Sequence, residues 1–265
     1  MKNLILVLTI LFSANLFSVK ALAKVVTEPV TYKEGNTELH GFVVYDNAKA
    51  AKGKLPGVVV VHDWMGVSDY VKMRATQLAD MGYVAFVADI YGAADTPKDQ
   101  KQAAVSAGKY RSGDRKLLRA RAEAAYNELK KNKFVNADKI SATGYCFGGS
   151  TVLEMARMGL PLKGIVSFHG GLASNNPEDA KNIKAKVLVL HGALDPYESK
   201  EEVVQFQKEM NDAKIDYVFT SYSGAVHAFT QKQAGDDISK GAAYNENADK
   251  RSYIAAKEFL EEVNK

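Results

Sequence analysis

Apolar runs and stretches with helical periodicity alternate along most of the chain. Residues 58–61 are four consecutive valines, and a second apolar run occupies residues 164–168. Uninterrupted runs of this kind are typical of strands buried on both faces of a parallel sheet. Between them, apolar residues recur at helical spacing, as in Val71, Ala75 and Leu78. The alternation predicts an α/β fold with a mostly parallel central sheet and helices on both faces.

Two short segments before these runs are expected to pair as an antiparallel N-terminal hairpin. Residues 30–33 and 38–45 flank a turn-like segment at residues 34–36, and Pro29 suits an edge strand, where a missing N–H is tolerated. The other expected strands are residues 83–88, 139–145, 186–191 and 217–222. The expected helices are residues 97–110, 114–131, 148–158 and 247–263, together with a helix opened by the capping box at residues 199–202.

The first 23 residues have the three parts of a secretory signal peptide. A positive start precedes an apolar stretch at residues 4–12, and small residues stand at Ala21 and Ala23. The apolar stretch is shorter than the roughly 20 residues that a membrane span needs. We therefore expect residues 1–23 to be a signal peptide, so that the mature protein is periplasmic or secreted without stable membrane insertion. No linker divides the remainder, and residues 24–265 are expected to form one domain.

Composition narrows the class of protein. The chain has 265 residues, of which 46% are hydrophobic and 25% charged, as in ordinary folded proteins. Its net charge is +4, and no stripe of Lys and Arg stands out along the sequence. Nucleic-acid binding therefore has no support from the charge pattern. The sequence contains no phosphate-binding G-x-x-x-x-G-K and no H-x-H, H-E-x-x-H or C-x-x-C spacing. We expect neither an organic cofactor nor a metal.

The chain has one cysteine, Cys146, so it cannot form an internal disulfide. An unpaired thiol is unusual in an oxidising compartment, which leaves it either buried and inert or chemically employed. The residue lies between an expected strand and an expected helix, in Gly144-Tyr145-Cys146-Phe147-Gly148-Gly149.

This sequence has the layout of a nucleophile elbow with Cys in place of Ser. Small residues at Gly144 and Gly148 leave room for a sharp turn, and a helix N-terminus favours the thiolate. The backbone N–H of Phe147 would then be free to bind an oxyanion. The alternative is a small buried core cysteine in a tight turn.

Two further residues complete a catalytic order. Asp195 follows the strand at residues 186–191, and His227 follows the strand at residues 217–222. A carboxylate can orient an imidazole, although an aspartate in such a loop is also a common turn or cap residue. The sequence Cys146, Asp195, His227 has the order nucleophile, acid, base of the α/β-hydrolase fold.

The loop after the valine strand supplies the remaining candidates. By its position, the backbone N–H of Trp64 is expected to be the second oxyanion donor. Asp63 beside it places a carboxylate at the mouth of the thiol site, unless it is simply an exposed acid in a strand-end loop. Among the other histidines, His169 is a candidate for lining the site, whereas His191 and His40 are expected to be structural.

These motifs resemble the dienelactone hydrolases over essentially the whole mature chain. The resemblance implies a Cys146–His227–Asp195 triad, with Trp64 and Phe147 as oxyanion donors. A glutamate that modulates the thiol in characterised members corresponds to Asp63, which is one methylene shorter. Tyr145, Phe229 and His169 are expected to line the substrate pocket.

Two positions depart from the lactone-cleaving members of that family. Gln231 stands where an arginine binds the substrate carboxylate, and Ala228 stands where those members carry a hydroxyl. The anionic lactone pocket is therefore not reproduced residue for residue.

The expected function is hydrolysis of a small-molecule ester or lactone through a cysteine acyl-enzyme, by a monomeric protein of α/β-hydrolase fold. Two alternatives stay open. One is a catalytically inactive or redox-responsive binding protein on the same fold, and the other is a thioesterase or peptidase that uses the same triad.

Overall fold

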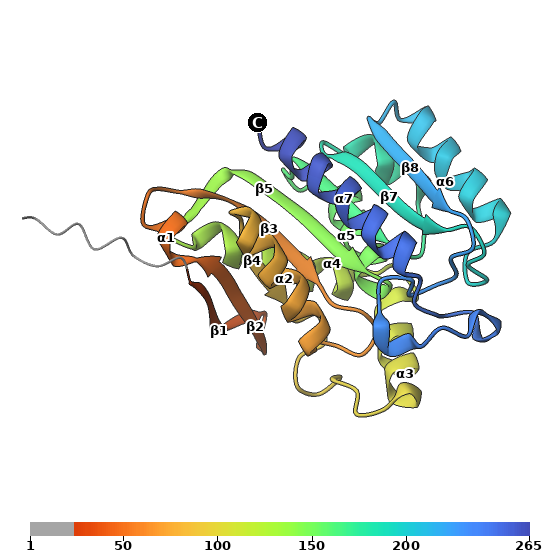
Figure 1. The fold of residues 1–265 in the computed structure, drawn as a ribbon, viewed down its shortest axis with the longest axis horizontal. Helices are drawn as coiled ribbons and strands as arrows, with labels where there is room; N and C mark the ends of the chain where they lie inside the picture. Colours follow the sequence, from red (N-terminus) through yellow and green to blue (C-terminus); the bar gives the residue numbers. More distant parts are fainter. Residues whose placement is uncertain (1–23) are drawn as a thin grey trace, which may run out of the picture.

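The computed structural model describes residues 24–265, in which eight strands form a sheet with the order β1-β2-β4-β3-β5-β6-β7-β8 (Figure 1). The strands are β1 (Val25–Glu34), β2 (Thr37–Asp46), β3 (Leu55–Val61), β4 (Val84–Ala88), β5 (Val135–Tyr145), β6 (Gly164–Phe168), β7 (Lys186–Gly192) and β8 (Tyr217–Tyr222). The helices are α1 (Asn47–Ala50), α2 (Asp69–Met81), α3 (Gln100–Arg111), α4 (Lys116–Lys131), α5 (Phe147–Arg157), α6 (Lys200–Asp212) and α7 (Glu246–Val263), with 3₁₀ turns η1 (Pro177–Asn182), η2 (Lys232–Ala234) and η3 (Ile238–Lys240). The expected signal peptide lies outside the described residues.

The sheet is parallel except at one edge. Strands β3 to β8 pair in parallel, whereas β2 is antiparallel to both β1 and β4. The predicted hairpin is confirmed: it turns at Gly35, whose φ of 54° suits a glycine, and Pro29 lies in the edge strand β1. Because the strands from β3 onward run the same way, their carboxyl ends meet at one edge, where parallel sheets place their sites.

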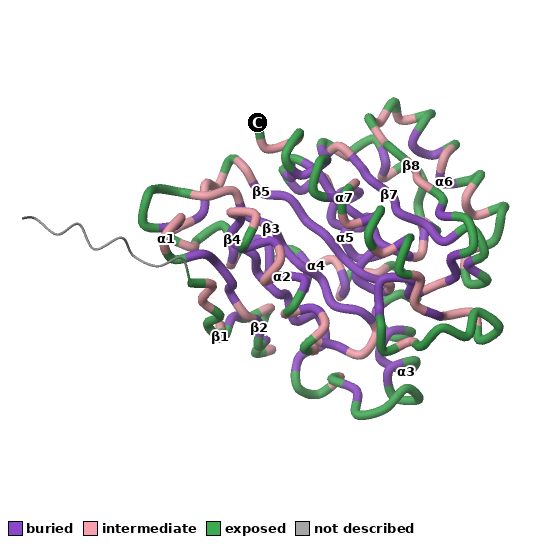
Figure 2. Tube along the Cα trace, in the orientation of Figure 1, coloured by how far each residue is buried: buried purple, intermediate pink, exposed green. Residues whose placement is uncertain are grey.

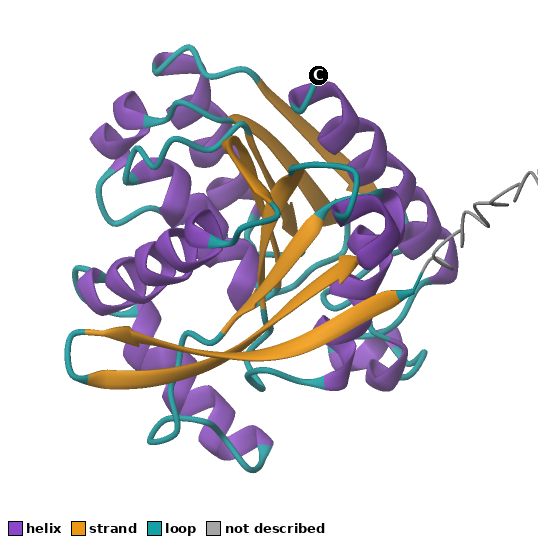
Figure 3. Ribbon diagram, turned by 90° about the vertical axis from the view of Figure 1, so that its left-hand side faces the viewer, coloured by secondary structure: helices purple, strands orange, loops and turns teal. Residues whose placement is uncertain are grey.

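Alternate residues of the central strands pack against opposite helix layers. Val58 and Val60 of β3 belong to a buried cluster with α2 and α7, and Val59 and Val61 belong to another with α4 and α5. Figure 1 shows α2 and α7 across the nearer face, and Figure 3 shows the twisted strands between helices on both sides. Burial follows the central strands in Figure 2. The predicted α/β-hydrolase architecture is confirmed.

A few element boundaries differ from those expected. Strand β5 begins at Val135 because that residue already pairs with Leu55, before a register shift at Pro56/Gly57. The short α1 and the 3₁₀ turns were not predicted, since segments of three to six residues carry no detectable periodicity. Within residues 24–265, every helix is too short or too polar to span a lipid bilayer.

Candidate active site

The turn between β5 and α5 holds Cys146 in a backbone conformation that is rare for a residue with a side chain. Its φ is 55° and its ψ is −113°, a kind of conformation that costs about 1–3 kcal/mol. A Cβ on Gly144 would lie 2.0 Å from the Gly148 carbonyl oxygen, and a Cβ on Gly148 would lie 2.3 Å from the Val61 carbonyl oxygen. The two glycines therefore make the sharp turn sterically feasible.

The thiol of Cys146 stands half-buried at the N-terminus of α5. Its sulfur lies close enough to the imidazole of His227, which comes from the loop after β8, to raise the pKa of that imidazole. The positive end of the helix dipole favours a negative sulfur at this point. Cys146 and His227 are thus brought close together although they are 81 residues apart in the sequence.

His227 is also paired with Asp195. Its Nδ1 lies 2.8 Å from Asp195 Oδ2, and the Asp195 side chain is fully buried. The other oxygen, Oδ1, accepts the Tyr197 N–H at 2.9 Å, which fixes the carboxylate. Burial alone would lower the pKa of His227, but the sulfur of Cys146 and the Asp195 carboxylate outweigh burial and hold that pKa well above its usual value. The arrangement stabilises an imidazolium between two negative groups.

Two backbone N–H groups, one after β3 and one at the start of α5, are the predicted oxyanion donors. The N–H of Trp64, after β3, and the N–H of Phe147, at the start of α5, have no acceptor among residues 24–265. The buried His62 fixes this region, because its Nδ1 donates to the Asp63 carbonyl at 2.6 Å and its ring stacks on Phe147 at 5.7 Å. Tyr91 adds a hydrogen bond from its hydroxyl to the Trp64 carbonyl at 3.1 Å.

Asp63 is buried with both carboxylate oxygens occupied. Oδ1 accepts the Met65 N–H at 2.7 Å, and Oδ2 accepts the Gln231 side-chain N–H at 2.9 Å. Burial raises the pKa of Asp63, and His227 is close enough to oppose that rise. The sequence allowed Asp63 to be either an exposed loop acid or a carboxylate at the mouth of the thiol site. In the structure Asp63 is not exposed, and its carboxylate is held by the Gln231 amide, from the loop that also carries His227.

The chain matches the model of the dienelactone hydrolase family over residues 41–264. It belongs to the dienelactone hydrolase family. It is 38% identical to the solved structure of a dienelactone hydrolase-like promiscuous phosphotriesterase from metagenomic libraries, with a TM-score of 0.85 over 90% of this chain and 98% of that one.

Two curated relatives are also similar in sequence. A Bradyrhizobium protein described as a probable 2-oxo-3-(5-oxofuran-2-ylidene)propanoate lactonase is 29% identical over 73% of this chain and 82% of its own. An uncharacterised Caenorhabditis elegans protein is 36% identical over 55% of this chain and 94% of its own. Membership of the family makes the chain an ester or lactone hydrolase.

In this hydrolase, the three residues expected to line the pocket are buried. Phe229 is fully buried, and Tyr145 packs on Phe168 with ring centroids 4.7 Å apart. His169 is only 1% exposed and has a partner on each ring nitrogen. Tyr145 ends β5 and His169 follows β6, whereas Phe229 lies in the loop after β8, and all three are packed in the core.

Several residues near the hydrolase site carried no sequence signal. Glu198, in the loop after β7, accepts the Leu172 N–H at 3.0 Å, and burial raises its pKa to about 7. The exposed ring of Tyr197 stands edge-on to His227 at 5.2 Å. Thr230 contacts Tyr70 of α2 and His169, which follows β6. Such contacts join distant segments, so no local spacing could have shown them.

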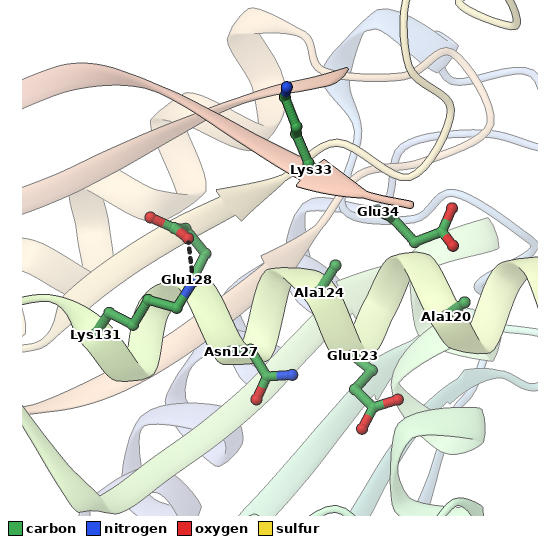
Figure 4. A pocket seen from close by; sticks show the side chains of 8 residues that line it. All are labelled: Lys33, Glu34, Ala120, Glu123, Ala124, Asn127, Glu128 and Lys131. Atoms are coloured by element: carbon green, nitrogen blue, oxygen red, sulfur yellow. Dashed lines mark hydrogen bonds and ion pairs between the residues drawn. The ribbon is translucent and has the colours of Figure 1, made fainter. Parts of the chain in front are cut away.

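Two surface hollows do not include the triad. A depression of about 450 Å³ lies between β1 and α4 and is lined by polar side chains such as Lys33 and Glu123 (Figure 4). A cleft of about 720 Å³ runs between the starts of α2 and α7, with Arg74 and Thr230 among its walls. No cluster of three metal-ligating side chains occurs within residues 24–265.

Proposed function

We propose that the protein hydrolyses an ester or lactone through a thioester on Cys146, with His227 as the base and Asp195 as its orienting acid. The observation that carries the proposal is the position of His227 between Cys146, whose sulfur raises its pKa, and the buried Asp195 carboxylate, which lies 2.8 Å from its Nδ1. With Nδ1 bonded to Asp195, the other ring nitrogen of His227 is left for the thiol.

The reaction follows from these positions. The sulfur of Cys146 attacks the carbonyl carbon, and its proton passes to His227. The N–H groups of Trp64 and Phe147 bind the resulting oxyanion, each worth roughly 3–4 kcal/mol by analogy with measured oxyanion holes. Collapse expels an alkoxide, which takes the proton from His227. A water molecule that His227 deprotonates then attacks the thioester, releasing the acid and restoring the thiol.

Asp63 is proposed to modulate the thiol site through charge. Its carboxylate lies near His227 and is tied to Gln231. A negative charge there favours the imidazolium form of His227. The neutral Gln231 favours a substrate without a carboxylate beside the reacting bond.

The test is an activity screen of residues 24–265 against neutral aryl esters, neutral lactones and a lactone that bears a carboxylate. Cys146→Ala should abolish turnover of every substrate that the wild type cleaves. Undiminished activity of that variant would refute the assignment. Failure of the wild type on all substrates, with a thiol that still reacts rapidly with iodoacetamide, would favour the redox-responsive binding protein instead.

A neutral aryl phosphotriester is the second candidate substrate. Its support is the neutral Gln231 together with the likeness to a promiscuous phosphotriesterase at 38% identity. The same screen should include it, because turnover beyond one equivalent would separate hydrolysis from simple phosphorylation of Cys146.

We also propose that residues 1–23 direct export and are removed after Ala23. Expression of the full chain, followed by N-terminal sequencing of the exported protein, should give Lys24 as the first residue. A retained Met1 would contradict this. The monomeric state stays a prediction, which light scattering of the same sample would test.

A further inference from the structure

His169 is a buried histidine that the proposed reaction does not use. It follows β6 with a φ of 39°, which is unusual for a residue with a side chain, and its side chain is 1% exposed. A strained, buried and polar residue beside the triad needs a reason, because such features persist only where the surroundings enforce them.

Its two ring nitrogens have distinct partners. The Cys146 N–H points to both the Phe168 carbonyl, at 3.0 Å, and His169 Nδ1, at 3.1 Å. Because that partner is a donor, Nδ1 must be the unprotonated nitrogen. The ring proton is therefore on Nε2, which donates to Thr230 Oγ1 at 2.7 Å. The neighbours fix one neutral tautomer.

Thr230 is in turn fixed from the opposite side. Its hydroxyl lies 2.6 Å from the Tyr70 hydroxyl, and its carbonyl accepts a hydrogen bond from Arg74 at 2.8 Å. Arg74 is also bound to Asp249 of α7 at 2.6 Å. Thr230 stands three residues after His227 in the same loop, so His169 joins the cysteine turn to the histidine loop.

The His169 ring also packs directly on the base. Its ring lies edge-on to His227, with centroids 5.2 Å apart, and to Phe229, at 5.1 Å. Burial, then His227, Arg74 and His191, lower the pKa of His169 well below its usual value. A neutral ring can touch the His227 imidazolium without repelling it, and it keeps Nδ1 as an acceptor for Cys146.

We propose that His169 is a positioning residue for this reaction. Oriented by Thr230, it holds the Cys146 turn and the His227 ring in the relative position that thiol attack requires. The inference rests on the proposed cysteine mechanism. It assigns to one side chain the task of coupling two catalytic loops that no backbone pairing joins directly.

Two substitutions of His169 test the contacts of its two ring nitrogens separately. In His169→Asn the side-chain amide ends where Nδ1 lies, so it can still accept from Cys146 but cannot reach Thr230. In His169→Gln the amide reaches Thr230 but leaves Nδ1 unreplaced. Thr230→Val removes the hydroxyl at nearly constant shape, and His40→Gln, at an exposed histidine of β2, is the control.

We expect kcat of His169→Gln to fall about 100-fold with KM within about threefold, because small displacements of reacting groups cost this much. His169→Asn and Thr230→Val should each lose about tenfold, and Thr230→Val should add little to His169→Asn, which already lacks that bond. The pH profile of Cys146 alkylation by iodoacetamide should shift in His169→Gln and stay unchanged in His40→Gln.

The outcomes are separable. If Cys146→Ala is inactive while His169→Gln, His169→Asn and Thr230→Val keep wild-type kcat and alkylation profiles, the positioning role is wrong and the mechanism stands. If Cys146→Ala keeps activity, the mechanism itself fails. Should His169→Gln not fold, as judged by its circular dichroism melt, Thr230→Val decides by the same two measurements.

Discussion

The loops after β3 and β7 each place a buried aspartate near the same imidazole, yet the two acids have different surroundings. Asp195 faces His227 directly at 2.8 Å. Asp63 faces the neutral amide of Gln231 at 2.9 Å and the N–H of Met65. Both carboxylates are buried, so the hydrogen-bond partner of each one, rather than its burial, decides whether that carboxylate can support proton transfer. Asp195 is placed to orient a base, and Asp63 to add charge from a distance.

The largest effect is expected from Asp195→Asn. The amide cannot stabilise the imidazolium and can hold the wrong tautomer of His227, so kcat should fall about 10³–10⁴-fold, as in other triads. Steady-state kinetics on an aryl ester measures this, and Asp63→Asn is the matched control because it makes the same chemical change in the other loop. Equal losses in the two variants would show that the distinction between the loops is wrong.

The next largest effect is expected from Glu198 and concerns the stability of the folded protein. Its pKa of about 7 in the folded protein exceeds the 4.5 of a free side chain. The unfolded chain therefore releases this proton first, and the free energy of unfolding should fall as pH rises from about 4.5 to 7, by at most roughly 3 kcal/mol. Glu198→Gln keeps the acceptor for Leu172 and removes the titration.

Urea unfolding at several pH values between those limits tests this. The wild type should lose stability across the window relative to Glu198→Gln. Parallel curves for the two proteins would exclude a linked proton at Glu198.

Asp63→Asn should have the smallest effect, a loss of kcat of about tenfold or less. Removing a negative charge near His227 lowers the pKa of that imidazolium, so the acidic limb of kcat/KM against pH should move to lower pH by less than about one unit. A pH–rate profile of the variant measures the shift. Movement to higher pH would contradict the proposed charge effect.

The sequence predicted the fold well because apolar runs and breakers are local signals. Val58 to Val61 predict a central strand wherever they pack, and Gly144 and Gly148 predict a sharp turn by their size alone. The order of Cys146, Asp195 and His227 was likewise visible, since each follows its own strand.

The supporting contacts could not be predicted in the same way. Gln231 reaches Asp63 across 168 residues, and Thr230 reaches His169 across 61. Their meeting depends on how loops settle after the sheet is assembled, and many polar pairs would fit the sequence equally well. For the same reason, the burial of Tyr145 and Phe229 follows from packing rather than from spacing.

The single cysteine of the chain has a practical consequence for measurement. Because residues 1–265 contain no second sulfhydryl, one equivalent of a thiol-directed label reports one reaction centre. Intact-mass analysis of a labelled sample would then count the competent fraction of a preparation directly. A fluorophore or a substrate-shaped warhead attached there would need no background mutations, which makes the protein a ready scaffold for site-selective conjugation.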